Sequence, residues 1–468
     1  MQITLIGWLL IPMGMILALL FPRQLFFATI FSALFSATAI INIGSGESAS
    51  GVQVYLYFSS LLVARTAFDG LMHLQVKVSR SIRRPLMYLF GFVLVCFVSI
   101  GMPLWIDGRL AIMSAVLLDM TTTPLRFTSA NLTGIAYLLL GACSAAVIAQ
   151  RTVNPDDFRR SVKVYTWSGL FVSFWGMVQL ACHALHIPYP ALIFNSSATP
   201  SAQGFDSLLG DSGLQRISSV AVEPSLFAAS LLTIIPFSLM MFLGEGSIVS
   251  RRVDRWIFAL MFLSLLSSTS STAYVGLGVL VVVAMRYLKK YRGIRLRYLV
   301  LLGSGVFLVG AGYVLVAPFR DLLGSALFNK SEGYSALERA KSIVYAFSYF
   351  REYPILGIGW SSATSHDTVV KLLSNCGVVG LASFVMFVGS ILAPLRKRVA
   401  AVQPLEGAKV FDSPALLLLI NLLVLLSVAV MDGFPYVFGH FWVVLGFAMS
   451  AAVVSKDHPF LFTESSRR

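Results

Sequence analysis

The feature that most constrains this chain is a series of apolar blocks, each close to twenty residues long, along its whole length. An α-helix needs about 20 apolar residues to cross roughly 30 Å of hydrocarbon. The residues are 57% hydrophobic and only 12% charged, and the mean hydropathy is +0.82. Because water-soluble domains do not have this composition, the pattern predicts a polytopic helical membrane protein.

The blocks predict an all-α fold with about 13 transmembrane helices (range 12–14) in one integral membrane domain, residues 1–468. The first block has no basic segment before it and no obvious cleavage site, so we expect a retained helix and not a signal peptide. The expected spans are 3–21, 25–43, 52–74, 86–105, 130–149, 164–186, 225–243, 256–269, 272–287, 298–317, 370–394, 413–430 and 440–454.

The formal net charge of +14 is unevenly divided between alternate loops. Loops on one side hold roughly 25 Lys and Arg residues, against roughly 8 on the other side. Since an excess of Lys and Arg marks cytoplasmic loops, we expect the N-terminus outside, in the periplasm, and the C-terminus in the cytoplasm. The charge then reflects topology, and we expect no nucleic-acid partner. Two long loops, 187–224 and 318–369, fall on the extracytoplasmic side.

The chain carries no sequence motif for a metal or a cofactor. Its four cysteines lie in or beside separate apolar runs, and zinc spacing, a Walker loop and a dinucleotide fingerprint are absent. Gly357-x-Gly359 lacks the third glycine and the strand–turn–helix context of a nucleotide loop. We therefore expect no cofactor and no metal site.

One ionisable pair lies inside an expected span. Arg65 and Asp69 are four residues apart and so share a helix face. Charged residues within a span normally face the bundle interior or water. The pair is then either a structural ion pair that locks neighbouring helices or a polar patch lining a substrate cavity.

The chemistry-bearing residues gather in the two long external loops. The first loop ends in Arg216 and Glu223-Pro224-Ser225, directly before an apolar block. Proline suits a first helical turn and an acid suits a helix N-terminus, but a good helix start does not explain Arg216.

The second loop is the longest stretch that cannot sit in lipid. Residues 335–350 have the spacing of an amphipathic helix, and Pro354, Gly357 and Gly359 predict a tight turn after it. His366 and Asp367 stand just before the next apolar block. The apolar residues of the helix recur at i, i+3, i+7 and i+10: Leu337, Ala340, Val344 and Phe347.

Three features, in this order, resemble the superfamily of bacterial O-antigen polymerases and O-antigen ligases. The likeness covers roughly residues 210–395. Where many relatives have an Arg in the Ser-rich turn and an Asn after the His, this chain has no Arg in 266–272 and has Asp367. The three matching features are Arg216 with Glu223-Pro224-Ser225; Arg339 with Pro354-Ile355-Leu356-Gly357-Ile358-Gly359-Trp360; and His366 with Gly377-Val378-Val379-Gly380.

The resemblance implies a GT-C type fold and metal-independent glycan transfer from an undecaprenyl-diphosphate carrier, on the outer face of the bacterial inner membrane. Arg216 and Arg339 would bind the diphosphate, because the planar guanidinium pairs with phosphate oxygens. His366 would be the general base on the acceptor hydroxyl. Glu223 would orient this His, hold an Arg or act as the base itself. The candidate cavity-lining residues are Arg65, Asp69, Arg351 and Asp367.

The favoured function is polymerisation of lipid-linked repeat units into O-antigen, capsule or exopolysaccharide. Its expected partners are the lipid-linked donor and acceptor, the bilayer, a chain-length regulator and a flippase. One alternative is an O-antigen ligase that transfers the glycan to lipid A core or protein. An alternative from another class is a membrane transporter of a small anion, for which paired broken helices would be the sign.

Overall fold

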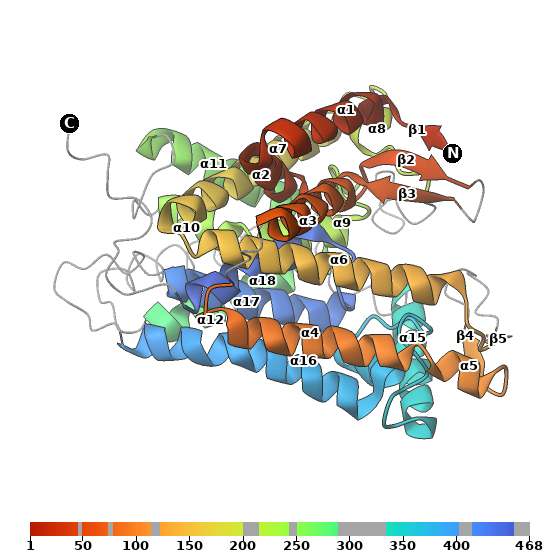
Figure 1. Cartoon of the computed structure of the whole chain (residues 1–468). Coiled ribbons are helices and arrows are strands. Elements are labelled where there is room, and N and C mark those ends of the chain that lie inside the picture. The colour runs from red at the N-terminus through yellow and green to blue at the C-terminus, as the bar shows by residue number, and fades with distance from the viewer. Residues whose placement is uncertain are drawn as a thin grey trace.

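The computed structural model describes residues 1–44, 49–73, 78–113, 122–199, 215–242, 250–288, 334–401 and 414–453. Most of these residues form long helices that run along one common direction (Figure 1). The expected span 298–317 and the beginning of the second external loop, 318–333, lie outside the described residues.

The helices of the first half precede the first long loop. They are α1 (Leu5–Leu20), α2 (Pro22–Ser32), α3 (Val54–His73), α4 (Arg83–Ser99), α5 (Met102–Ile106), α6 (Ser129–Thr152), α7 (Pro155–Ala184) and α8 (Ala191–Phe194). The helices that follow are α9 (Pro224–Leu232), α10 (Ile235–Phe242), α11 (Arg251–Ser267), α12 (Ser271–Leu288), α15 (Tyr334–Glu352), α16 (Thr368–Ala401), α17 (Pro414–Asp432) and α18 (Gly439–Ala451).

Within the described ranges, three helices are long and apolar enough to cross a membrane: Arg83–Ile106, Ser129–Thr152 and Thr368–Ala400. The pair α9 and α10 makes a fourth if the two helices, bent by 52° at their junction, form one span. Shorter apolar helices are Leu5–Leu20, Ser271–Arg286, Ala415–Val430 and Gly439–Ala451. The expectation of a largely helical chain with membrane-length apolar helices is therefore confirmed, and the count of thirteen spans stays a prediction.

Two small sheets correct the all-α prediction. Strands β1 (Gln2–Ile3), β2 (Ala39–Ile43) and β3 (Ser50–Gln53) form one antiparallel sheet, and β4 (Ala111–Met113) pairs with β5 (Thr122–Pro124). The expected span 25–43 was wrong, since α2 ends at Ser32. The reason lies in β2, whose backbone groups are taken by strands on both sides. Its β-branched isoleucines also favour a strand.

The core of the bundle is α18, in which every residue is buried. A helix that is apolar all round belongs inside a protein or a membrane. It packs closely on α6, where a Cβ on Gly141 would lie 2.1 Å from the Trp442 ring and one on Gly446 2.7 Å from Ile148. Small residues at such a crossing let two helix backbones approach.

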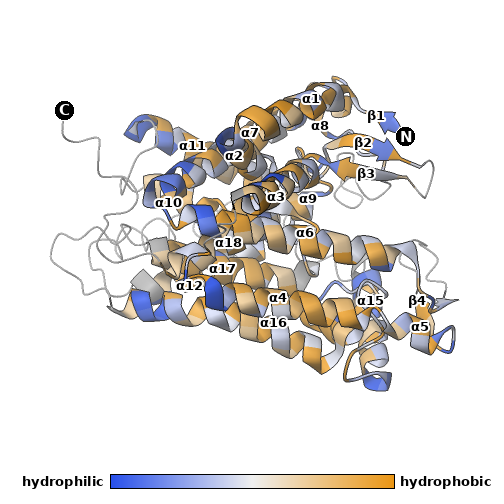
Figure 2. Ribbon diagram, viewed as in Figure 1, coloured by the Kyte–Doolittle hydropathy of each residue, from blue (hydrophilic) through white to orange (hydrophobic). Residues whose placement is uncertain are grey.

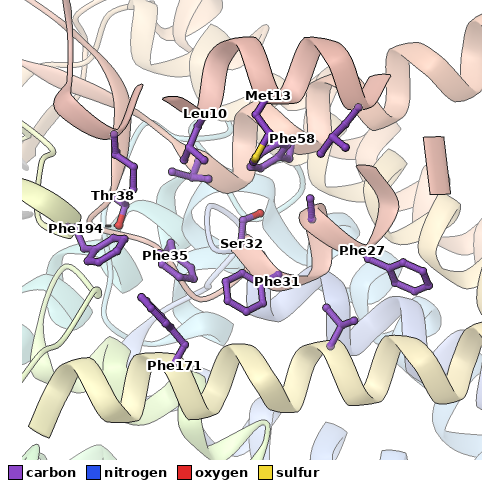
Figure 3. A pocket seen from close by; sticks show the side chains of 15 residues that line it. Leu10, Met13, Phe27, Phe31, Ser32, Phe35, Thr38, Phe58, Phe171 and Phe194 are labelled. Carbon is purple, nitrogen blue, oxygen red and sulfur yellow. Dashed lines mark hydrogen bonds between the residues drawn. The ribbon is translucent and has the colours of Figure 1, made fainter. Parts of the chain in front are cut away.

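The two ends of the bundle differ in character. Both sheets and α15 gather at one end, which we call the loop end (Figure 1). Basic residues gather at the opposite end, where α16 and α11 carry hydrophilic residues (Figure 2). This basic end includes Arg23, Arg83, Arg84, Arg151, Arg251, Arg252, Arg286, Arg396, Lys397 and Arg398. The segregation agrees with the charge asymmetry of the loops, while the orientation in a membrane stays a prediction.

Candidate functional site

The first external loop enters α9 through a fixed backbone. Glu223 is the N-cap residue of α9, in extended conformation, and its carboxylate accepts a hydrogen bond from the Ser225 hydroxyl. Upstream, Gln179 Oε1 accepts the backbone N–H groups of Ser218 and Ser219 at 3.0 and 2.8 Å. These bonds fix the path between Arg216 and Glu223, and the helix N-terminus stabilises the negative carboxylate.

Arg216 lies within electrostatic range of Glu223, Arg339 and Tyr274. Burial lowers the pKa of Arg216, Glu223 raises it and the neighbouring cation Arg339 lowers it again. An arginine nevertheless remains protonated in proteins. Its Nε is buried and has no hydrogen-bond partner among the described residues. Arg216 therefore lies within electrostatic range of a second arginine and of one carboxylate, a local excess of positive charge suited to an anion.

Arg339 is supplied by α15, which lies across the ends of α4 and α16 (Figure 1). The predicted helix at 335–350 is confirmed, and its apolar side faces outward. Leu337, Val344 and Phe347 are 50%, 68% and 45% exposed, whereas Ser342 and Tyr349 are buried. The helix turns its hydroxyl-bearing side inward, which brings Arg339 and Ser342 to the site.

His366 is joined to α15 through Ser342. The Ser342 hydroxyl donates to the Arg339 carbonyl oxygen at 2.8 Å, and its Oγ lies 3.1 Å from His366 Nδ1. Because the one hydroxyl proton of Ser342 is used in the first bond, Oγ is the acceptor in the second. In the neutral imidazole, this assignment puts the proton on Nδ1 and the lone pair on Nε2. This is the tautomer that a general base acting through Nε2 requires.

The backbone that delivers His366 docks into a break in α16. Gly377 has φ 64° and ψ −165°, which interrupts the helix. The carbonyls of Ser374 and Asn375 accept N–H groups from Ile358 and Gly359 at 2.8 and 3.0 Å. The N–H groups freed beyond the break, of Val378 and Val379, donate to the carbonyls of Pro354 and Ile355 at 2.8 and 3.3 Å. Inside a membrane every backbone polar group needs such a partner.

Glycines make this docking feasible. A Cβ on Gly357 would lie 2.5 Å from the Ser374 carbonyl oxygen, and one on Gly377 would lie 2.1 Å from the Ile355 oxygen. Both residues have positive φ, which side chains rarely adopt. The glycines that carry the family resemblance are therefore structural residues, and they hold the segment between Arg339 and His366.

Two buried asparagines, which sequence reasoning missed, complete the support. Asn375 Oδ1 accepts the N–H groups of Ser362 and Ala363 at 3.0 and 3.1 Å. Asn131, on α6, donates from Nδ2 to the Trp360 carbonyl at 2.7 Å and to Ser362 Oγ at 2.9 Å. A polar amide inside an apolar block requires a partner, and this was the available signal for both residues.

The remaining predicted residues have other surroundings. Arg65 Nε pairs with Asp69 at 2.9 Å, and Arg65 also donates to the Ala18 and Leu19 carbonyls at the end of α1. The pair thus caps α1, roughly 20 Å along that helix from the sheet at the loop end. This geometry fits the structural reading and not the cavity-lining one.

Arg351 and Asp367 have other surroundings. Arg351 is exposed near the end of α15, roughly 18 Å along the helix axis from Arg339. Asp367 Oδ1 accepts the Val370 N–H at 2.8 Å, as an N-cap residue does. The structure therefore gives Asp367 a capping role at the start of α16.

Metal-ligating side chains do not gather in the part of the chain that the structure describes. There, no three His, Cys, Asp or Glu residues are placed to hold a metal ion. Cys96 and Cys376, from distant apolar blocks, bring their thiols to 3.7 Å between α4 and α16. Both are buried and free.

No protein-family model matches this chain, and no curated protein matches it. The site is therefore interpreted from its geometry. Arg216 lies within electrostatic range of Arg339 and of the Glu223 carboxylate, and His366 contacts Ser342 on the helix that carries Arg339. Such a set suits proton removal from a nucleophile combined with departure of an anionic leaving group.

Proposed function

We propose that the protein is a membrane glycosyltransferase that polymerises oligosaccharide repeat units carried on a polyisoprenoid diphosphate such as undecaprenyl diphosphate. It would act on the outer face of a bacterial inner membrane, in synthesis of O-antigen, capsule or exopolysaccharide. The observation that carries the proposal is that Arg216 and Arg339, from the two long loops, lie within electrostatic range of each other. His366 Nδ1 lies 3.1 Å from the hydroxyl of Ser342, which is one helical turn from Arg339 on α15.

The proposed reaction follows from these positions. His366 Nε2 takes the proton of an acceptor sugar hydroxyl, and the hydroxyl oxygen forms a bond to the anomeric carbon of the donor. The bond between that carbon and the diphosphate oxygen breaks, and the electron pair leaves with the diphosphate. Arg216 and Arg339 stabilise the charge that develops on this leaving group. Glu223 holds Arg216 electrostatically.

An O-antigen ligase would use the same donor chemistry and differ in its acceptor, lipid A core or protein. The guanidinium pair and His366 serve both reactions equally. Glycan profiles of a deletion strain separate the two activities. Loss of a polymerase leaves single repeats on the final acceptor, and loss of a ligase leaves long chains on the lipid carrier.

A transporter of a small anion is the second candidate, favoured by two interrupted helices. The α9–α10 pair bends by 52°, and α16 breaks at Gly377. In transporters, unwound backbone carbonyls of broken helices bind the transported ions. At the α16 break the Ser374 and Asn375 carbonyls instead accept N–H groups of the docked loop. This contact supports the enzyme over the transporter.

The proposal is tested by glycan transfer with purified protein and a lipid-linked repeat unit. Arg216→Ala and Arg339→Ala are each expected to lose most of the transfer, because a charge-assisted contact to the leaving group is removed. Arg351→Ala is the matched control, since Arg351 is an exposed arginine on the same helix as Arg339. It should retain transfer.

Near-normal transfer by both Arg216→Ala and Arg339→Ala would refute the diphosphate contact. Absence of any transfer by the wild-type protein, with anion uptake into proteoliposomes, would favour the transporter instead.

A further inference from the structure

Lys371 is a cation that the proposed reaction does not use. It lies on the first turn of α16, a helix with the length and hydropathy of a membrane span, and it is partly buried. Its ammonium group lies 5.3 Å from the centroid of the Tyr436 ring. An ionisable residue within such a helix is costly, and it normally faces a partner or a functional cavity.

No acidic side chain neutralises Lys371 within the described part of the chain. The ion pairs Arg23–Asp157 and Arg65–Asp69 lie elsewhere in these ranges, and neither involves Lys371. Asp367, one helical turn before Lys371, forms no ion pair with it within 4.0 Å, and its Oδ1 accepts the Val370 N–H. The aromatic face of Tyr436 stabilises a cation but does not cancel its charge.

The Tyr436 ring that Lys371 contacts carries a hydroxyl next to a second one. The Tyr436 hydroxyl lies 3.5 Å from Ser361 Oγ, and burial raises the pKa of Tyr436, so this hydroxyl keeps its proton. Trp442 Nε1 donates to the Tyr436 carbonyl at 2.7 Å and fixes the turn between α17 and α18. Ser361 has φ 65°, a strained conformation for a residue with a side chain.

The same turn also reaches His366. A Cβ on Gly433 would lie 2.9 Å from the Ser365 carbonyl oxygen and 3.6 Å from the His366 Cα. The segment 433–436 thus bridges the backbone at His366 and the ammonium group of Lys371. A substrate held at His366 would have this second polar cluster as its neighbour.

We propose that Lys371, with the hydroxyls of Tyr436 and Ser361, forms a second anion site, separate from the Arg216 and Arg339 pair. It takes an oxyanion of the substrate, either a phosphate of a lipid carrier or the carboxylate of an acidic sugar. In naming a substrate group the inference rests on the proposed glycan transfer. Its test measures binding alone, so that the two can fail separately.

The test is calorimetric titration of the purified full-length protein carrying Arg216→Ala and Arg339→Ala, which removes the first anion site. The two probes are inorganic diphosphate and glucuronate, one for each source of the oxyanion. Adding Lys371→Met should weaken binding of one probe by about tenfold or more, and Lys371→Arg should keep it within about threefold. Lys163→Met, at a partly buried lysine on α7, is the control and should have no effect.

The probe that responds identifies the source of the oxyanion. Binding of neither probe at millimolar concentration, or binding that Lys371→Met leaves unchanged, overturns the proposal. If Lys371→Met does not fold, Tyr436→Phe decides, because it removes one hydroxyl and keeps the ring. Weakening by about threefold or more supports the site, and unchanged affinity overturns it. Failure of the wild-type protein to transfer glycans refutes the proposed function and leaves this result standing.

Discussion

The docking of the 354–359 loop into the α16 break can be tested by adding one methyl group. Gly357→Ala forces a side chain onto φ +66° and places Cβ 2.5 Å from the Ser374 oxygen and the Asn375 carbonyl carbon. The left-handed conformation alone costs roughly 1–2 kcal/mol. Since the atoms that this Cβ would meet belong to the backbone, the clash is relieved only by moving the loop away from the helix.

Moving the loop breaks the four backbone hydrogen bonds that hold it at the break. At a net value of about 0.5–1.5 kcal/mol each, these bonds contribute roughly 2–6 kcal/mol. These bonds resist undocking in wild type and variant alike, so the shift in the variant comes from the strain of its docked state. The conformational cost of about 1–2 kcal/mol should therefore raise the population of the undocked loop by about 5–30-fold, and the clash adds to this, because each 1.4 kcal/mol is a factor of about ten.

Cys376 offers a local assay, since it is fully buried beside Gly377. Its rate of maleimide modification, followed by mass spectrometry of the intact protein, should rise sharply in Gly357→Ala, and glycan transfer should fall as His366 loses its support. Gly389→Ala is the matched control on the same helix, because a Cβ there meets nothing within 4 Å. If the two variants show equal Cys376 reactivity and equal thermal stability, the docking argument is refuted.

Three further predictions concern the histidine, the helix cap and the topology. His366→Ala should lower the turnover number by about 10²–10⁴-fold with little change in donor affinity. Ser342→Ala, which removes the hydrogen-bond partner of His366 Nδ1, should lower the turnover number less. If His366→Ala turns over within a few-fold of wild type, His366 is not the base. Asp367→Ala should lower stability by about 0.5–2 kcal/mol, measured by thermal unfolding in detergent, and an unchanged melting curve would contradict the cap. In a cysteine-free background, an impermeant maleimide added from outside should label Leu192→Cys and spare Arg80→Cys; the reverse pattern would invert the topology.

Much of the helical architecture followed from the sequence, because membrane-length apolar blocks leave a helix few alternatives. The failures arose where tertiary contacts override a local pattern. The block 25–43 is apolar throughout, yet its second part pairs as β2 with strands on either side. On α15 the spacing predicted an amphipathic helix but not which side faces His366, and that side carries Ser342.

The candidate site, like the fold, could be predicted from the sequence only in part. Arg216, Glu223, Arg339 and His366 were singled out from the sequence. The structure places Arg216 within electrostatic range of Glu223 and Arg339, and it places His366 beside Ser342 on the helix of Arg339; their joint role stays a prediction. The residues that support them were not foreseen. Asn131 bonds the backbone of a loop that is far away in sequence, and Asn375 bonds the same loop where it folds back onto α16. Hydrogen bonds to main-chain atoms leave no residue-type pattern in the loop that receives them. From the sequence, the Arg65–Asp69 pair could be either a structural ion pair or part of a cavity lining. The carbonyl groups on α1 that Arg65 bonds favour the structural role.

The helix break at Gly377 also bears on how such a protein can change over evolutionary time. The loop is held there by main-chain atoms, so substitutions at the exposed Ile355, for example, leave its four anchoring bonds intact. Only a few positions require glycine, and elsewhere the loop tolerates substitutions of its side chains. Two descendants of one ancestor can therefore keep the same histidine placement while their sequences diverge beyond recognition. In such a lineage the backbone path is retained longer than the identities of the residues.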